Sequence, residues 1–91
     1  MSADEGLAWG FWNRLADDVH AAALELARDI AAGPSFAHAV TKRQLDAEWD
    51  VGIETALDME AEAQALCMVT QDFRRAYEAF AAKRRPEFRG D

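Results

Sequence analysis

The end of the chain combines an aromatic ring with positive charge at a helical spacing. Phe80 and Lys83 lie three residues apart, so on a helix they share a face, and Pro86 is placed to stop that helix. A flat ring can pack on a nucleotide base, and an ammonium group can pair with a phosphate. The pair therefore suits a nucleotide-like ligand. The alternative is that the basic residues only complement the negative end of the helix dipole.

The histidines and the cysteine do not assemble into a recognisable catalytic pattern. His20 and His38 fall on different predicted helices, and neither has a Cys or a carboxylate at a metal-ligand spacing. We interpret both as surface or half-buried histidines. Cys67 sits in an apolar run with no His nearby in the sequence, which predicts a core thiol and not a reactive thiolate.

Carboxylates recur along one predicted helix, at Glu54, Asp58 and Glu62. Paired carboxylates can do acid–base chemistry, but a regular i, i+4, i+8 stripe on a helix flank is more typical of a solvated face. The glycines are scattered, so the chain has no glycine-rich phosphate loop. The residues by themselves therefore contain no complete active site.

Length, charge and cysteine content narrow the classes of partner. The 91 residues allow one small domain, and a net charge of −7 argues against nucleic acid as the main partner. Seven acidic and no basic residues lie between Asp46 and Glu62, whereas six basic and two acidic residues lie between Arg74 and Arg89. The single cysteine fits a reducing cytoplasm. We expect no signal peptide and no membrane span, because no suitable apolar run is present.

The chain is rich in large rings for its length, with three Trp, five Phe and one Tyr. Either these rings form a dense aromatic core, or some of them cover another surface. We favour the second interpretation, because large exposed apolar patches usually mark partner contacts. Phe73, Tyr77 and Phe80 follow an i, i+4, i+7 spacing, which places them on one face of the last predicted helix.

The elements that must position these residues are helical almost throughout. Ser2 and Glu5 form a capping box for a short first helix, which Gly10 ends. Segment 11–15 is aromatic and β-prone, so we expect it to be extended or a brief strand. A second helix begins at residue 17 or 18 and breaks at the Gly-Pro pair 33–34.

Three further helices are predicted. The third is capped by Ser35 and ends near residues 49–50, and the longest runs over about 51–69. Thr70 caps the last helix, which continues until Pro86 ends it. Because the breaks are short, we expect neighbouring helices to pack as hairpins, in an all-α fold of four to five short helices.

Five motifs in a fixed order carry a resemblance to a known family. They are Ala8-Trp9-Gly10-Phe11-Trp12-Asn13-Arg14, Ala31-Ala32-Gly33-Pro34, Thr41-Lys42, Thr70-Gln71-Asp72, and Ala79-Phe80 followed by Lys83-Arg84 and Pro86-Glu87-Phe88-Arg89-Gly90. Over essentially its whole length the chain resembles the C-terminal part of the enoyl-CoA hydratase/isomerase (crotonase) family. It departs from the family pattern at Arg75-Ala76, where Glu-Gly is frequent, and at Phe11-Trp12, where Leu-Val is common.

The resemblance implies that the N-terminal and C-terminal parts of such enzymes have different roles. The two catalytic glutamates and the oxyanion hole lie in an N-terminal α/β spiral core, which would precede the first residue of this chain. The C-terminal helices build the contacts of a trimer or a dimer of trimers, and they close one side of the acyl-CoA site. Phe80 and Lys83 match the aromatic and lysine positions that contact CoA. The resemblance thus implies one C-terminal helical domain over 1–91, with 1–15 as the remnant of a junction to the core.

Two functional hypotheses follow. In the first, the chain is the C-terminal fragment of a cytoplasmic enoyl-CoA hydratase/isomerase-like enzyme of fatty acid metabolism, which adds water to 2-enoyl-CoA and needs no cofactor beyond the CoA thioester substrate. Such a fragment supplies oligomer contacts and part of the CoA-binding edge, and by itself is inactive. Hydratase, isomerase, thioesterase and decarboxylase reactions all occur on this scaffold, so the acyl substrate stays open. In the second, the chain is a stand-alone helical module that self-associates through Phe73, Tyr77 and its Trp residues.

Overall fold

The computed structural model describes residues 1–91 and contains helices but no strand. The elements are α1 (Ala3–Ala8), α2 (Val19–Ala31), α3 (Ser35–Ala47), the short 3₁₀ helix η1 (Glu48–Asp50), α4 (Ile53–Met68) and α5 (Gln71–Ala81). The prediction of an all-α fold with four to five short helices is confirmed. None of the helices is both long and apolar enough to cross a membrane.

Most helices begin where a local side chain can satisfy a free backbone N–H. The Ser2 hydroxyl accepts from the Glu5 amide at 3.1 Å, and the Glu5 carboxylate accepts from the Ser2 amide at 2.7 Å, which closes the predicted capping box. Asp18 caps α2 by accepting from the Ala21 amide at 2.9 Å. Gly10, at φ +73°, follows the end of α1 as predicted.

Segment 11–15 is irregular and folds back on α1, so the strand alternative is wrong. The amides of Phe11 and Trp12 both donate to the carbonyl of Gly6, at 2.8 and 3.2 Å. The Trp12 ring lies so close to Gly6 that a Cβ there would be 2.3 Å from the indole nitrogen. The amides of Phe11 and Trp12 are thus committed to α1 and not to a strand partner.

The start of α3 corrects one prediction. Ser35 is the first helical residue and makes no capping hydrogen bond, because Pro34 occupies the cap position. The carbonyl of Pro34 already accepts from the His38 amide at 3.0 Å, so the helix begins one residue earlier than the sequence suggested. The Ser35 hydroxyl instead lies beside Gly90, where a Cβ would approach it to 2.6 Å.

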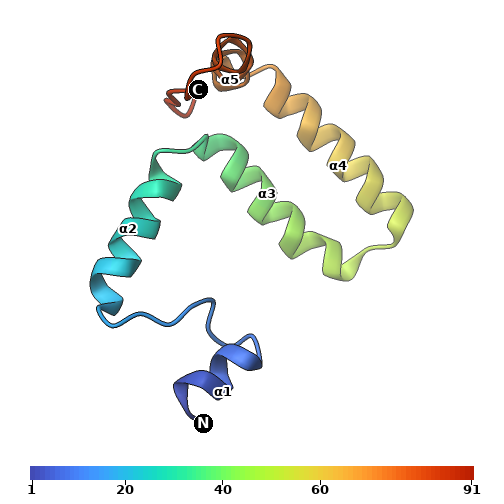
Figure 1. Ribbon diagram of the computed structural model, residues 1–91. Coiled ribbons are helices and arrows are strands. Elements are labelled where there is room, and N and C mark those ends of the chain that lie inside the picture. Colours follow the sequence, from blue (N-terminus) through green and yellow to red (C-terminus); the bar gives the residue numbers. More distant parts are fainter.

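The helices form an open arrangement with a packed C-terminal half (Figure 1). α3 and α4 run side by side as a hairpin through η1, and α5 packs at the end of α4. α1 and α2 extend away from this hairpin and make at most marginal contacts with other helices. The radius of gyration is 17.1 Å, whereas a closed fold of this length has about 12 Å. The hairpin prediction therefore holds for α3 and α4 but is wrong for α1 and α2.

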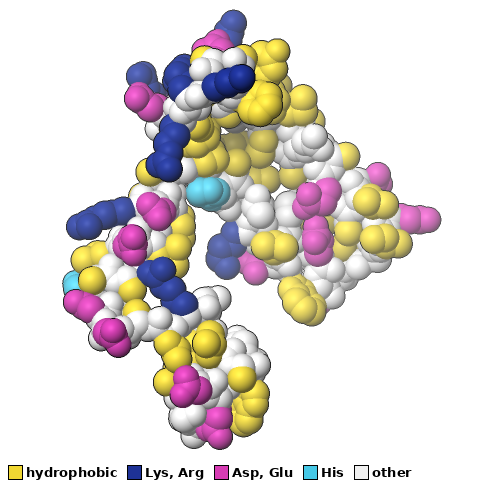
Figure 2. Space-filling model, viewed as in Figure 1, with side chains coloured by type: hydrophobic (Ala, Val, Ile, Leu, Met, Phe, Trp, Pro, Cys, Tyr) yellow, Lys and Arg dark blue, Asp and Glu magenta, His cyan; other side chains and the backbone are white.

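Very little of the chain is buried. Only five of the 91 residues are buried, and the apolar ones are Val40, Ala63 and Ala79. Hydrophobic side chains lie on the visible surface of several helices (Figure 2). Trp49 is 89% exposed and Phe80 is 83% exposed. The dense aromatic core is therefore absent, and the rings are available to cover another surface, as we favoured.

The thiol of Cys67 is not in a core. Its residue is only half-buried, and the neighbours Leu66, Met68 and Val69 are exposed. The prediction of a core thiol is wrong, because the apolar run that suggested burial finds no covering surface within the chain.

Thr70 joins α4 to α5. Its hydroxyl accepts from the Phe73 amide at 3.1 Å and donates to the Cys67 carbonyl at 2.7 Å, which confirms the predicted N-cap. We expect Thr70→Ala to lower the free energy of unfolding by about 0.5–2 kcal/mol, because the Phe73 amide loses its capping partner. Ser35→Ala is the matched control and should change it by less than about 0.5 kcal/mol. Urea unfolding followed by circular dichroism measures both, and equal effects would contradict the assignment.

Candidate functional site

The C-terminal end of α5 is a Schellman turn with a lysine at its left-handed position. The helix ends at Ala81, the amide of Lys83 donates to the Phe80 carbonyl at 3.0 Å, and the amide of Arg84 donates to the Ala79 carbonyl at 2.9 Å. Lys83 has φ +52°. The helix therefore stops before Pro86, and the prediction that Pro86 ends it is wrong. The capping bonds of the turn terminate it first.

This ending changes the geometry of the predicted ligand pair. Lys83 lies beyond the last helical residue, so the argument that it shares a helical face with Phe80 does not hold. The two residues stay adjacent all the same, because the Schellman hydrogen bond joins their backbones. Both side chains are exposed. We call residues 83–85 the basic turn; its three cations, Lys83, Arg84 and Arg85, make no ion pair.

A lysine at this position is conformationally unfavourable. Left-handed backbone brings Cβ close to the following carbonyl and costs about 1 kcal/mol for a residue other than glycine. Glycine is the usual occupant of this position in a Schellman turn. Residues in sparsely populated backbone regions cluster at functional sites, which makes Lys83 a candidate functional residue.

The N-terminal end of α5 holds the last residues of the chain through Asp72. One carboxylate oxygen of Asp72 accepts from the Arg89 amide at 2.8 Å, and the other accepts from the Gly90 amide at 2.7 Å. In return, the Asp72 amide donates to the Asp91 carbonyl at 2.8 Å. Asp72 is only 3% exposed, which makes it the one buried charged side chain. We call this set of bonds the Asp72 latch.

Arg75 completes the latch from one turn along α5. Its guanidinium donates to the Asp72 carboxylate at 2.6 Å and also to the Asp91 carboxylate. Hydrogen bonds to Asp91 first and Asp72 second raise the pKa of Arg75. Arg75 lies at one of the two places where the sequence departs from the family pattern, and here it supplies a cation between two carboxylates.

The carboxylates of the latch are held in their charged form. Burial by itself raises the pKa of Asp72, but the hydrogen bonds from the backbone of Arg89 and Gly90, with that of Arg75, outweigh it and keep the pKa below its ordinary value of 3.8. The hydrogen bond from Arg75 is the main reason why the pKa of Asp91 is also lowered.

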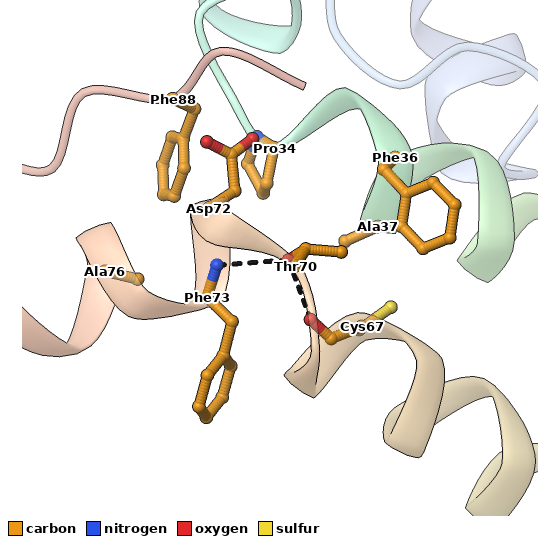
Figure 3. A pocket seen from close by; sticks show the side chains of 9 residues that line it. All are labelled: Pro34, Phe36, Ala37, Cys67, Thr70, Asp72, Phe73, Ala76 and Phe88. Carbon is orange, nitrogen blue, oxygen red and sulfur yellow. Dashed lines mark hydrogen bonds between the residues drawn. The ribbon is translucent and has the colours of Figure 1, made fainter. Parts of the chain in front are cut away.

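A small apolar cavity lies beneath the latched tail (Figure 3). Its volume is about 160 Å³. Asp72 lies between Phe88 of the tail and Pro34 of the α2–α3 connection, and Cys67 and Thr70 form part of another wall. The remaining lining residues are Phe36, Ala37, Phe73 and Ala76. The latch thus brings the tail, α5, the end of α4 and the start of α3 together at one place.

The other residues singled out from the sequence are not brought together. His20 lies on α2 and His38 on α3, where the His38 ring packs against Gly33. Glu54, Asp58 and Glu62 lie along α4. No three His, Cys, Asp or Glu side chains converge as a metal-binding group would. The Asp72 latch was not predicted from the sequence, where Asp72 stood out only as part of the motif Thr70-Gln71-Asp72.

Comparison with known proteins identifies the fold. No family model matches the chain. The 1,2-epoxyphenylacetyl-CoA isomerase of Escherichia coli K12 is 34% identical over 92 residues, which cover 99% of this chain and 35% of that protein. A putative enoyl-CoA hydratase from Streptomyces coelicolor A3(2) superposes with a TM-score of 0.92 and 38% identity, over all of this chain and 34% of that structure.

The chain matches the C-terminal part of the enoyl-CoA hydratase/isomerase family. An enoyl-CoA hydratase subunit I from Geobacillus kaustophilus HTA426 supports the same assignment, with a TM-score of 0.90 and 26% identity over all of this chain and 36% of that structure. The resemblance drawn from the ordered motifs is confirmed, and the all-α fold is that of the helical C-terminal part of crotonase-fold enzymes. The chain spans about a third of the length of these relatives.

The lowered pKa values of Asp72 and Asp91 predict when the tail is released by acid. A carboxylate with a lowered folded-state pKa stabilises the fold fully above its unfolded value, and this contribution is lost as pH falls through the folded value. The Gly90 amide, which donates to a carboxylate, should therefore keep its downfield proton shift below pH 3.8 and lose it only at lower pH. Two-dimensional NMR follows this resonance. A transition above pH 3.8 would contradict the latch, and Asp72→Asn should abolish the shift at every pH.

Proposed function

We propose that the chain serves as the C-terminal helical part of an enoyl-CoA hydratase/isomerase-like enzyme, where it supplies oligomer contacts and one edge of the CoA site. Its relatives are an isomerase that acts on 1,2-epoxyphenylacetyl-CoA and hydratases of enoyl-CoA, so each is named for a CoA thioester. The observation that carries the proposal is the exposed Phe80 ring beside a strained, unpaired Lys83.

The chemistry of this edge fits the nucleotide end of CoA. The Phe80 ring offers a flat apolar face for adenine, and the basic turn offers ammonium and guanidinium groups for phosphates. Lys83 is held by the Schellman turn next to Phe80, so ring and cation meet the ligand together. The net charge of −7 repels a polyanion at long range, whereas this local cluster of three cations attracts a compact one.

The edge binds but does not catalyse. In the proposed assembly, the groups that polarise the thioester carbonyl and activate water lie outside residues 1–91. Within these residues, the three-carboxylate stripe Glu54, Asp58 and Glu62 lies on α4 and not beside the basic turn. The 91-residue chain is therefore proposed to bind CoA weakly and to leave crotonyl-CoA unchanged.

Substitution of Lys83 tests the CoA edge. Lys83→Ala should weaken the binding of CoA to the chain several-fold, because a phosphate loses its ammonium partner. Lys83→Gly should weaken it equally while raising the free energy of unfolding by about 1 kcal/mol, since glycine adopts the left-handed turn without strain. NMR titration gives the affinity and urea unfolding the stability.

Arg28→Ala, in the last turn of α2, is the matched control for loss of one positive charge. It should leave CoA affinity unchanged. Unchanged affinity in Lys83→Ala, or hydration of crotonyl-CoA above background by the same sample, would overturn the proposal.

A second candidate is a stand-alone helical module that self-associates, and the open arrangement favours it as well. Tyr77 is 67% exposed and Phe73 44% exposed on the same face of α5 as Phe80. Covering such a face in water is worth about 25 cal/mol for each Å² of apolar surface removed. The two candidates differ in their ligand, since only the first needs Lys83 and CoA.

Self-association is expected under both candidates. Size-exclusion chromatography with light scattering should give a mass above 10.1 kDa, and Tyr77→Lys should shift it toward the monomer, because a charge is placed on the apolar face of α5. His20→Lys, which adds a charge on α2 away from that face, is the control. A clean monomer at all concentrations would count against oligomer contacts in either candidate.

A further inference from the structure

The C-terminal tail is a strap fastened at both ends of α5. At one end the Schellman turn binds Lys83 and Arg84 to the last turn of the helix. At the other end the Asp72 latch binds Arg89 and Gly90 to its first turn. The tail therefore runs back along α5 from its C-terminal to its N-terminal end, and Figure 1 shows the chain end beside this helix.

The tail is only slightly longer than the distance that it must span along α5. Asp72 and the C-cap residue Ala82 are ten positions apart along α5, which is about 15 Å along the helix axis. Six steps of fully extended chain from Lys83 to Arg89 reach at most about 20 Å. Pro86 fixes one φ angle within this stretch and so reduces its freedom further. A displacement of Arg89 from the latch therefore frees the segment that leads to the basic turn.

We propose that Asp72 is a positioning residue for the basic turn, and that it sets where Lys83, Arg84 and Arg85 meet the phosphates of an acyl-CoA. This inference rests on the proposed function of Lys83. Asp72 touches no ligand in it. The residue acts through the strap, by holding the amides of Arg89 and Gly90.

A carboxylate is the side chain that this task requires. Its two oxygens accept from two successive backbone amides, and one of them accepts from Arg75 as well. An asparagine of the same size has one acceptor oxygen, and its amide group would face a backbone donor. It would also leave Arg75 without one of its two carboxylate partners. Asp72→Asn should therefore open the latch with little change in volume.

Gly90 offers a second, independent way to open the latch. It has φ +81°, and a Cβ would lie 2.6 Å from the Ser35 hydroxyl, so Gly90→Ala strains the tail without altering any charge. Gly52 is the matched control. A Cβ there meets nothing within 4 Å and the backbone has no positive φ, so Gly52→Ala should leave the strap in place.

The experiment measures the affinity of the full chain for two pieces of CoA by NMR titration. Adenosine 3′,5′-bisphosphate carries phosphates and the base, and pantetheine carries neither. We expect Asp72→Asn and Gly90→Ala each to weaken nucleotide binding several-fold and to leave pantetheine binding unchanged. Both should also remove the downfield shift of the amide at residue 90, while helix content by circular dichroism is retained. Gly52→Ala should behave as the unaltered chain.

A double-mutant cycle separates positioning from general loss of structure. If Asp72 acts through Lys83, the variant Asp72→Asn with Lys83→Ala should bind the nucleotide about as weakly as Lys83→Ala alone. Additive losses, or equal losses for nucleotide and pantetheine, would overturn the positioning role. Unchanged nucleotide binding in Asp72→Asn and Gly90→Ala, with weakened binding in Lys83→Ala, would overturn it and leave the proposed function standing. An unaffected Lys83→Ala would instead overturn the proposed function.

Discussion

An amphipathic helix gains most of its stability by covering its apolar face, and this chain has little surface of its own with which to do so. Three apolar residues are buried, all of them small or medium in size, and rings as large as those of Trp49 and Phe80 stay in solvent. The shape follows from this shortage. α1 and α2 have no facing helix and extend outward, whereas α3 and α4 cover each other only along one seam.

The Asp72 latch contains the hydrogen bonds that join the residues farthest apart in the sequence. A buried charge is unfavourable unless it is paired and hydrogen-bonded, and Asp72 has two backbone donors and one guanidinium. Hydrogen bonds are directional, so they fix the tail in one position, whereas apolar contacts would allow several positions. This is why the C-terminal third is held together by polar geometry around a small cavity, and not by a packed core.

The sequence predicted features whose cause is local. The caps at Ser2 and Thr70 depend on a side chain meeting an amide three residues away, so a spacing rule finds them. The errors have two sources. Ser35 was wrongly predicted as a helix cap and Pro86 as a helix stop. In both cases a backbone hydrogen bond of an earlier residue sets the helix boundary: the Pro34 carbonyl begins α3, and the Schellman bonds end α5. The hairpin arrangement failed at α2 because packing depends on a complementary surface, which no spacing within one helix reveals.

The candidate site likewise contains residues that could be predicted from the sequence and residues that could not. Phe80 and Lys83 could be chosen from residue type and nearness, although the helical face that suggested them does not extend to Lys83. The latch could not, because Asp72 reaches residues 17 and 18 positions away, and no local pattern requires that pairing. The sequence shows the latch only indirectly: Asp72 belongs to the motif at the start of α5, and Gly90 belongs to the motif that follows its end.

The residue at position 83 connects the stability of the Schellman turn with the proposed function. A glycine at its position would make the Schellman turn more stable, and the chain has little stability to spare. The side chain of Lys83 forms no ion pair, so within the 91 residues only the two backbone hydrogen bonds of the Schellman turn offset the cost of its left-handed backbone. The proposed contact with the phosphates of CoA would give this strained cation a role that it lacks within the chain. The exposed rings fit the same proposal, since the oligomer contacts that it includes would remove their apolar surface from water.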